Sequence, residues 1–160
     1  MGGNIFESNL RIWSKEAFEA LFQQQQKLFE HITDKLYIPR EIASKTTFGD
    51  LDIIVPEQFL NAVVSLLETQ GLPLSINTNV ISYQYEQHQV DLIFLKEEYI
   101  PYAINYFSFG DHGNVIGRLS KRHGLKNGFK GFQHTFERDN GNVKIDIPVS
   151  MDYVEMLNYL

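Results

Sequence analysis

The segment 49–55 has the sequence Gly-Asp-Leu-Asp-Ile-Ile-Val and restricts the possible folds of this chain more than any other stretch. Its aliphatic end predicts a short strand over 51–55, and the apolar spacing that follows predicts a helix that ends at Gly71. Alternate side chains of a strand share one face, so Asp50 and Asp52 point to one side while residues 51, 53 and 55 point to the other. The sequence therefore predicts a strand-helix unit with two carboxylates on its open face.

A third aspartate, Asp91, interrupts the apolar stretch 89–95, which also has the composition of a strand. If the two strands are neighbours, Asp91 joins Asp50 and Asp52 in a cluster of three carboxylates. Like charges this close repel, so divalent cations best explain the cluster, and oxygen-only ligands suit Mg²⁺ or Mn²⁺. Two such ions about 4 Å apart would activate an attacking hydroxyl and stabilise a leaving pyrophosphate. The structural alternative makes Asp50 a turn residue and the other two ordinary acids at strand edges.

The rest of the chain alternates between predicted helices and strands. A helix is expected over 15–33, capped by Ser14 and with the glutamines 23–26 on its mostly exposed turn, and a hairpin joins strands 80–85 and 89–95. Later helices are expected over 97–107, 113–123 and 152–160, with a second hairpin around the turn 139–142. We therefore expect an α+β fold, in which a mixed β-sheet flanked by helices precedes a small C-terminal lobe of helices and a β-hairpin. The expected domains are 1–105 and 106–160.

The composition argues against several classes of protein. No run of about 18 apolar residues is present and the amino terminus lacks the pattern of a secretion signal, so no membrane partner is expected. The absence of cysteine excludes disulfides and thiolate metal ligands, and a reducing cytoplasm is the expected location. The formal net charge of -6 argues against a protein that binds nucleic acid over its whole surface.

Basic residues nevertheless gather in one segment, 118–130, which we call the basic segment. Its cationic residues are Arg118, Lys121, Arg122, Lys126 and Lys130. Such a cluster is either a solvated helical face or a patch that contacts phosphates, and the sequence leaves both interpretations open. Any contact with DNA or RNA is therefore expected to be local and to involve this segment.

The acidic motif resembles the catalytic core of the DNA polymerase beta superfamily of nucleotidyltransferases, in which Gly-Asp-x-Asp precedes an aliphatic strand and a third aspartate lies on a later strand. Beyond Asp91, the segment 106–118 is similar to the family X polymerase pattern Tyr-Phe-Thr-Gly-Ser followed by an asparagine and an arginine. The resemblance implies that Tyr106 and Phe107 lie beside the sugar of the incoming nucleotide. It implies further that Asn114 reaches the minor-groove edge of the base, that Arg118 reaches the template strand, and that Asp91 lies closest to the attacking hydroxyl.

The resemblance covers about residues 40–160, which correspond to the palm and the nucleotide-selecting lobe of these polymerases. One part of the family pattern is missing, because the Gly-Ser pair that cradles the triphosphate is replaced by the segment 38–45. Proline in this segment cannot donate a backbone hydrogen bond to a phosphate. Arg40, Ser44 and Lys45 are expected to bind the triphosphate instead with side-chain donors, beside Gly49 of the acidic motif.

Together these features predict a metal-dependent nucleotidyltransferase that uses a nucleoside triphosphate and releases pyrophosphate. Within that class we expect a minimal family X-like DNA polymerase or terminal transferase, because Asn114 and Arg118 have no obvious use on a small molecule. A rival enzyme would transfer the nucleotide to RNA, a protein or a small metabolite, and the acidic composition favours this rival. A third possibility is a nucleotide-binding module that keeps the fold without activity, which the missing Gly-Ser pair favours and the three acids oppose.

Overall fold

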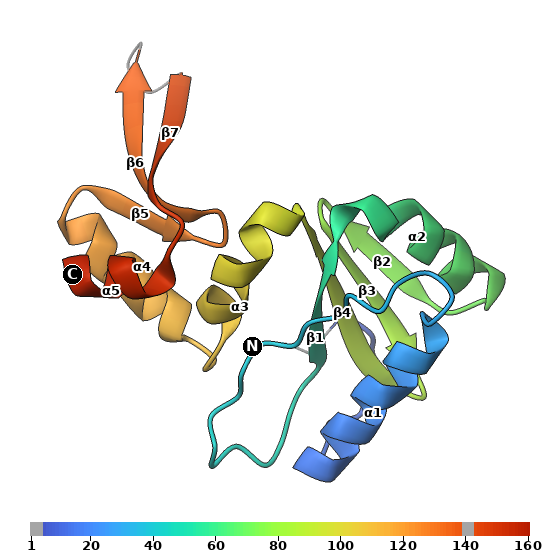
Figure 1. Ribbon diagram of the computed structural model, residues 1–160. Coiled ribbons are helices and arrows are strands. Elements are labelled where there is room, and N and C mark those ends of the chain that lie inside the picture. Colours follow the sequence, from blue (N-terminus) through green and yellow to red (C-terminus); the bar gives the residue numbers. More distant parts are fainter. Residues whose placement is uncertain (1–4, 139–142) are drawn as a thin grey trace. The chain divides into compact units, whose positions relative to one another are not determined.

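The chain forms two compact units in a computed structural model that describes residues 5–138 and 143–160 (Figure 1). The amino-terminal unit consists of Met1–Ile38 and Ala43–Glu97, and the carboxyl-terminal unit of Pro39–Ile42 and Glu98–Leu160. The chain therefore enters the second unit briefly at residue 39 before it completes the first. The assignment of 1–105 as a palm and of 106–160 as a nucleotide-selecting lobe stays a prediction.

The amino-terminal unit is built on a mixed sheet, as the sequence predicts, and the sheet has four strands. Its strands are β1 (Leu51–Pro56), β2 (Leu74–Asn77), β3 (Val80–Tyr85) and β4 (His88–Leu95), in the order β1-β4-β3-β2. The β1 and β4 strands are parallel, whereas β4 with β3 and β3 with β2 are antiparallel. The short edge strand β2 has no counterpart in the sequence prediction, because its residues Leu74–Asn77 are mostly exposed and carry little apolar pattern.

Helices α1 (Lys15–Leu28) and α2 (Leu60–Thr69) share one hydrophobic core with the sheet. The predicted cap of α1 is confirmed, since the side chain of Ser14 accepts a hydrogen bond from the backbone N–H of Ala17. Helix α1 ends earlier than predicted, because the backbone N–H groups of Ile32 and Thr33 both turn back to the carbonyl of Phe29. This turn places the Phe29 ring in the core, where it is fully buried.

The glutamine run of α1 is mostly exposed, as predicted, with the exception of Gln25. Gln25 is fully buried, and its side-chain carbonyl accepts a hydrogen bond from the Tyr83 hydroxyl on β3. This bond satisfies the amide oxygen, whereas the buried Nε2 group of Gln25 has no hydrogen-bond partner among the described residues. The helical spacing of Gln25 with Phe18 and Leu21, which are also buried, is the reason for its position on the inner face.

A tight hairpin joins the two central strands. Its linking residues Glu86 and Gln87 have φ angles of 48° and 68°. Two successive left-handed residues are the geometry of a type I′ turn, whose twist matches that of the flanking strands. The sequence prediction of a three-residue link is therefore wrong by one residue, since His88 already belongs to β4.

The carboxyl-terminal unit packs three helices against a three-stranded antiparallel sheet. The elements are α3 (Ile100–Phe107), α4 (His112–Arg122), β5 (Leu125–Gly128), β6 (Gly131–Arg138), β7 (Val143–Ser150) and α5 (Tyr153–Tyr159), with the strand order β5-β6-β7. The core of this unit consists of Tyr102, Ile116, Leu125, Phe132, Tyr153 and Met156. The predicted turn over 139–142 lies outside the described residues.

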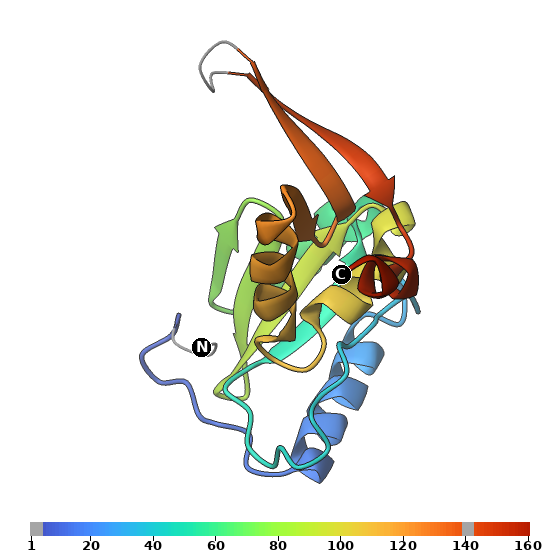
Figure 2. The same ribbon diagram turned by 90° about the vertical axis from the view of Figure 1, so that its left-hand side faces the viewer.

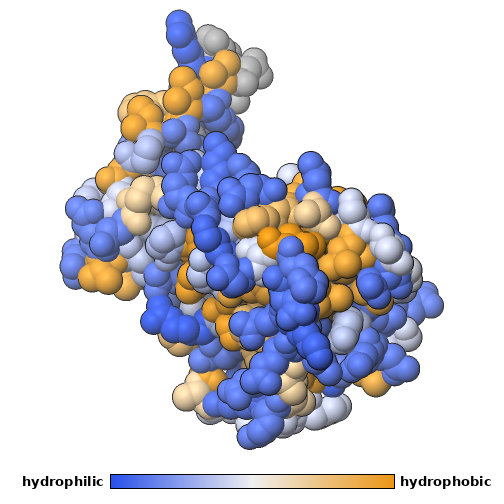
Figure 3. Space-filling model, turned by 45° about the vertical axis from the view of Figure 1, so that its right-hand side comes forward, coloured by the Kyte–Doolittle hydropathy of each residue, from blue (hydrophilic) through white to orange (hydrophobic). Residues whose placement is uncertain are grey.

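Strands β6 and β7 form a long two-stranded ribbon (Figure 2). Apolar side chains gather on its surface (Figure 3), and Phe136 and Ile145, which face each other across the ribbon, are each about half exposed. Among the described residues, no helix is long and apolar enough to cross a membrane.

Candidate metal centre

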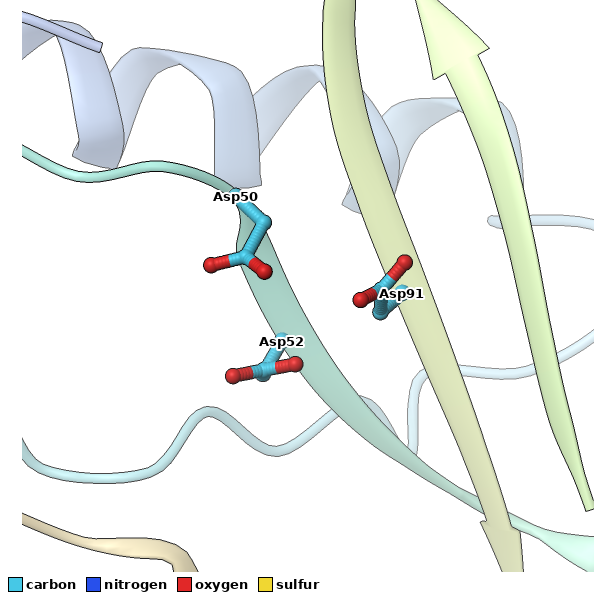
Figure 4. A group of neighbouring side chains, drawn as sticks. All are labelled: Asp50, Asp52 and Asp91. Atoms are coloured by element: carbon cyan, nitrogen blue, oxygen red, sulfur yellow. The ribbon is translucent and has the colours of Figure 1, made fainter. Parts of the chain in front are cut away.

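The three predicted acids converge at one end of the parallel strand pair. Asp52 on β1 is the direct register partner of Asp91 on β4, and Asp50 immediately precedes β1. Each acid offers a carboxylate oxygen that lies within 4.8 Å of the corresponding oxygens of the other two (Figure 4). The strand neighbourhood on which the sequence prediction depended is therefore confirmed.

The alternation of side chains along the strands separates these acids from the hydrophobic core. Leu51 and Ile53 flank Asp52 on β1, and Val90 and Leu92 flank Asp91 on β4; all four apolar side chains are fully buried. They pack with the helices on one face of the sheet, so the aspartates between them point to the opposite face. None of the three acids is fully buried, which leaves their carboxylates accessible to a ligand.

Asp91 lies beside two polar side chains of the central strands. The side-chain amide of Gln89 lies 3.0 Å from Oδ1 and 3.1 Å from Oδ2 of Asp91, and Ser82 is its direct partner on β3. Burial raises the pKa of Asp91 above its usual value, while hydrogen bonds from Ser82 and Gln89 act in the opposite direction. The carboxylate is therefore partly desolvated yet held by neutral donors.

The donor set fits a hard divalent cation. It consists only of carboxylate oxygens, which Mg²⁺ and Mn²⁺ prefer over nitrogen or sulfur ligands. A cation would also offset the mutual repulsion of three like charges at this separation. The geometry therefore supports divalent-metal binding by Asp50, Asp52 and Asp91.

The amino-terminal unit, which contains the acids, also contains three of the residues predicted to bind the triphosphate: Gly49, Ser44 and Lys45. The Gly49 carbonyl accepts a hydrogen bond of 3.0 Å from the side-chain amide of Asn9. The ammonium group of Lys45 lies 4.9 Å from the centre of the Phe48 ring, and Ser44 is exposed. The Lys45 side chain is thus partly oriented by an aromatic neighbour next to the acidic motif.

Arg40, the fourth predicted triphosphate ligand, belongs to the carboxyl-terminal unit. Its backbone N–H donates to the Ser108 hydroxyl at 2.8 Å, and its carbonyl accepts from the N–H of Phe109 at 2.7 Å. Its guanidinium donates to the Asn105 side chain and lies 5.5 Å from the centre of the Phe109 ring. These contacts fix Arg40 beside the end of α3.

The residues predicted to select the nucleotide all lie on α3 and α4. Tyr106 and Phe107 end α3 with their rings edge to face at 5.1 Å, while Asn114 and Arg118 are exposed on α4. The two helices approach closely at Gly113, where an added Cβ atom would lie 2.4 Å from the Tyr106 carbonyl oxygen. A glycine is therefore required at this crossing.

The basic segment spans the second half of α4 and β5, and its cationic residues are exposed. A pocket of about 440 Å³ opens beside it and is lined by Lys121 and Lys126, with Lys144 from β7. Lys126 and Lys144 are paired with Asp146 and Glu137, at 2.7 Å and 2.9 Å. The positive charge of this surface is thus partly offset by acids of the ribbon.

Two polar neighbours of Asp91 were not identified from the sequence. Gln89 and Ser82 are almost completely buried, with exposed fractions of 1% and 3%. Gln89 had a detectable signal, because a residue two positions before Asp91 in a strand must share its face. Ser82 had none, because its position opposite Asp91 depends on the register of the β3–β4 pair.

The chain is similar to a known protein in its fold but not detectably in its sequence. No protein-family model matches the chain, and no curated protein matches it in sequence. Among solved structures, the chain is similar to polymerase beta of Leishmania infantum in a ternary gap complex, with a TM-score of 0.64 and 14% sequence identity. The similarity covers 79% of this chain and 52% of the polymerase, so the chain spans about half the length of that protein. The chain therefore has an α+β, nucleotidyltransferase-like fold of the kind found in polymerase beta.

Proposed function

We propose that this chain is a metal-dependent nucleotidyltransferase, and more narrowly a minimal polymerase beta-like enzyme that adds nucleotides to a hydroxyl acceptor. The observation that carries the proposal is the convergence of Asp50, Asp52 and Asp91 within 4.8 Å on a fold similar to polymerase beta. Either feature alone is weak, because exposed acids often cluster without a metal and a fold hosts many functions. Their coincidence at the acidic motif supports the enzyme.

In the proposed reaction, a hydroxyl oxygen of the acceptor attacks the α-phosphorus of a nucleoside triphosphate, and the bond to the pyrophosphate breaks. Mg²⁺ or Mn²⁺ bound by the acids would supply charge neutralisation for the phosphates and activation of the hydroxyl. Asp91 is the proposed acceptor of the hydroxyl proton, because the resemblance implies that it lies closest to the attacking hydroxyl. Asp50 and Asp52 complete the cation-binding face.

We propose separate roles for the remaining predicted residues. Gly49, Ser44, Lys45 and Arg40 bind the triphosphate in place of the missing Gly-Ser pair; the orientation of Lys45 over Phe48 supports a side-chain donor in this role. Tyr106 and Phe107 contact the sugar of the nucleotide. Asn114 contacts the base and Arg118 the template strand, and both side chains are exposed on α4.

The basic segment is the proposed contact for DNA or RNA. Five exposed cations lie on consecutive elements of one unit, and the pocket beside them adds Lys144. Because the chain as a whole carries a net charge of -6, binding should be confined to this region and should weaken steeply with salt.

Two alternatives follow from specific observations. Transfer to RNA, a protein or a small molecule is favoured by the acidic net charge, which disfavours a long DNA contact. A nucleotide-binding module without activity is favoured by the missing Gly-Ser pair, because backbone amides of such a turn are efficient phosphate donors.

The deciding experiment measures incorporation of labelled nucleotide and release of pyrophosphate with Mg²⁺ or Mn²⁺ on gapped DNA, single-stranded DNA and RNA. We expect incorporation on at least one acceptor, and its loss in Asp52→Asn. Triphosphate binding in calorimetry without pyrophosphate release on any acceptor would instead identify the inactive module. Activity that survives Asp52→Asn would contradict the metal assignment.

A further inference from the structure

The carboxylate of Asp91 is held by a buried neighbour on its own strand. Gln89 precedes Asp91 by two positions on β4, so both side chains lie on the same face of the sheet. The Nε2 atom of Gln89 lies 3.0 Å and 3.1 Å from the two carboxylate oxygens, and the Gln89 side chain is 1% exposed. A donor shared between both oxygens fixes the rotation of the carboxylate about its χ angles.

Gln89 is in turn held by the beginning of the chain. Its side-chain carbonyl accepts a hydrogen bond of 3.0 Å from the backbone N–H of Ile5. Because the amide is engaged at both ends, its orientation is fixed: Oε1 faces the Ile5 backbone and Nε2 faces Asp91. A free surface glutamine would sample several rotamers instead.

The residues that follow Ile5 contact the chain just before both strands that carry the acids. The N–H of Leu10 donates to the carbonyl of Gln87, just before β4, at 2.7 Å. The Asn9 side chain donates to the carbonyl of Gly49, just before Asp50, at 3.0 Å. Ile12 and Phe48 exchange two backbone hydrogen bonds, of 2.9 Å and 2.8 Å. The segment 5–12 thus connects the start of β1 with the start of β4.

We propose that Gln89 is a positioning residue for Asp91, and that the segment 5–12 holds Gln89 so that the three acids bind a divalent cation in one fixed arrangement. The inference rests on the proposed metal-dependent function. A neutral amide suits this role, because it orients the carboxylate without offsetting the negative charge that attracts the cation. An arginine or lysine at the same place would orient the acid but would also compete with the metal.

The first test replaces Gln89 with methionine, which has a similar length and no amide. Loss of such an outer hydrogen bond typically weakens metal affinity about 10- to 100-fold. We expect a weakening in this range for Mn²⁺ measured by calorimetry, with unchanged circular dichroism. In the metal-free protein, the carboxyl ¹³C resonance of Asp91 should also shift, because the Gln89 donor no longer contacts it.

Gln84→Met is the matched control. Gln84 is the register partner of Gln89 on β3 and also contacts the segment 5–12, since its Nε2 atom donates to the Ser8 hydroxyl at 3.1 Å. This hydrogen bond serves the general attachment of the segment rather than the orientation of Asp91. We expect Mn²⁺ affinity and the Asp91 resonance to stay as in the unaltered protein.

A second pair of variants tests the role of the segment without changing Gln89. Ile5→Pro removes the backbone donor, whereas Ile5→Ala keeps it and changes only an exposed side chain. We expect Ile5→Pro to weaken Mn²⁺ binding in the same direction as Gln89→Met, and the double variant to add little to either, because both act on one hydrogen-bonded chain. Ile5→Ala should behave as the unaltered protein.

The outcomes separate this inference from the proposed function. If Asp52→Asn abolishes Mn²⁺ binding while Gln89→Met and Ile5→Pro bind normally and leave the Asp91 resonance in place, the positioning role is refuted and the enzyme proposal stands. If the Asp91 resonance shifts in both variants but Mn²⁺ affinity is the same in Asp52→Asn as in the unaltered protein, the metal site itself is refuted, and the cation-binding part of this inference with it.

Discussion

Asp52 and Asp91 are direct register partners on adjacent parallel strands, so their carboxylates lie on one face and approach each other across the β1–β4 pair. Asp50 immediately precedes β1, so one carboxylate oxygen of each of the three acids lies within 4.8 Å of those of the other two. A parallel pair of this kind needs a crossover connection, which α2 and the β2–β3 strands provide. The acids therefore meet only when the chain between β1 and β4 has folded so that these two strands pair.

A divalent cation should stabilise the folded protein measurably. A ligand that binds only the folded state adds about 2.7 kcal/mol to the free energy of unfolding at a concentration about 100-fold above its dissociation constant. We expect Mn²⁺ to raise Tm in differential scanning fluorimetry and EDTA to reverse the rise. Asp52→Asn should remove most of this effect, whereas Glu68→Gln, an exposed acid on α2, should keep it.

Without metal, Asp91→Asn should stabilise the protein at neutral pH. Burial raises the pKa of Asp91 in the folded state above its ordinary value of 3.8, so the folded protein binds a proton more readily than the unfolded chain. The contribution of Asp91 to stability is therefore fully present below pH 3.8 and falls as the pH rises through the raised folded-state pKa. Urea denaturation in EDTA across this range should show that fall in the unaltered protein. A similar fall in Asp91→Asn would assign it to another group.

The three acids of the site could be predicted from the sequence, whereas their hydrogen-bond partners could not. Asp50 and Asp52 were predictable because strand alternation is local, and Asp91 because a charge inside an apolar strand is costly without a purpose. The contacts of Asp91 with Ser82 and Gln89 depend on strand register and on where the segment 5–12 lies, which are properties of the folded chain.

The same limit applies to the fold. The long helices and the β3–β4 hairpin follow from periodicity and were predicted. The burial of Gln25 was not, because it requires the Tyr83 hydroxyl on a strand distant in the sequence. The strands β2 and β5 are four residues each, too short for a clear apolar pattern in the sequence, so pairing with their neighbours defines them.

Substitutions of two glycines in α4 should change the free energy of unfolding in opposite directions. Gly117→Ala places a Cβ atom 3.7 Å from the nearest carbonyl oxygen, which is ordinary contact, and should stabilise the helix by up to about 1 kcal/mol. Gly113→Ala places it 2.4 Å from the Tyr106 carbonyl oxygen, and overpacking of this kind costs about 1–3 kcal/mol. Urea denaturation of both variants checks the difference. Equal stability of the two would mean that α3 and α4 are not tightly packed at this crossing.

Replacing basic residues of α4 should weaken nucleic-acid binding and reduce its dependence on salt. Removal of one cation that neutralises a phosphate lowers the slope of log affinity against log salt by about 0.9 on duplex DNA. We expect Lys121→Ala with Arg122→Ala to lower affinity at low salt and to flatten this slope in fluorescence anisotropy. Lys27→Ala, an exposed cation of α1, provides the control. An unchanged slope in the double variant would favour the solvated helical face.

The short segment Pro39–Ile42 belongs to the carboxyl-terminal unit, which limits how the protein can be divided into fragments. Neither unit is one continuous stretch of chain, so a single cut cannot produce both as intact fragments. A polypeptide ending at Glu97 would retain Arg40 but lose Asn105, Ser108 and Phe109, to which it is attached. Limited proteolysis between the units should therefore give fragments that remain associated. Separate expression of the carboxyl-terminal unit would require residues Pro39–Ile42 to be supplied with it.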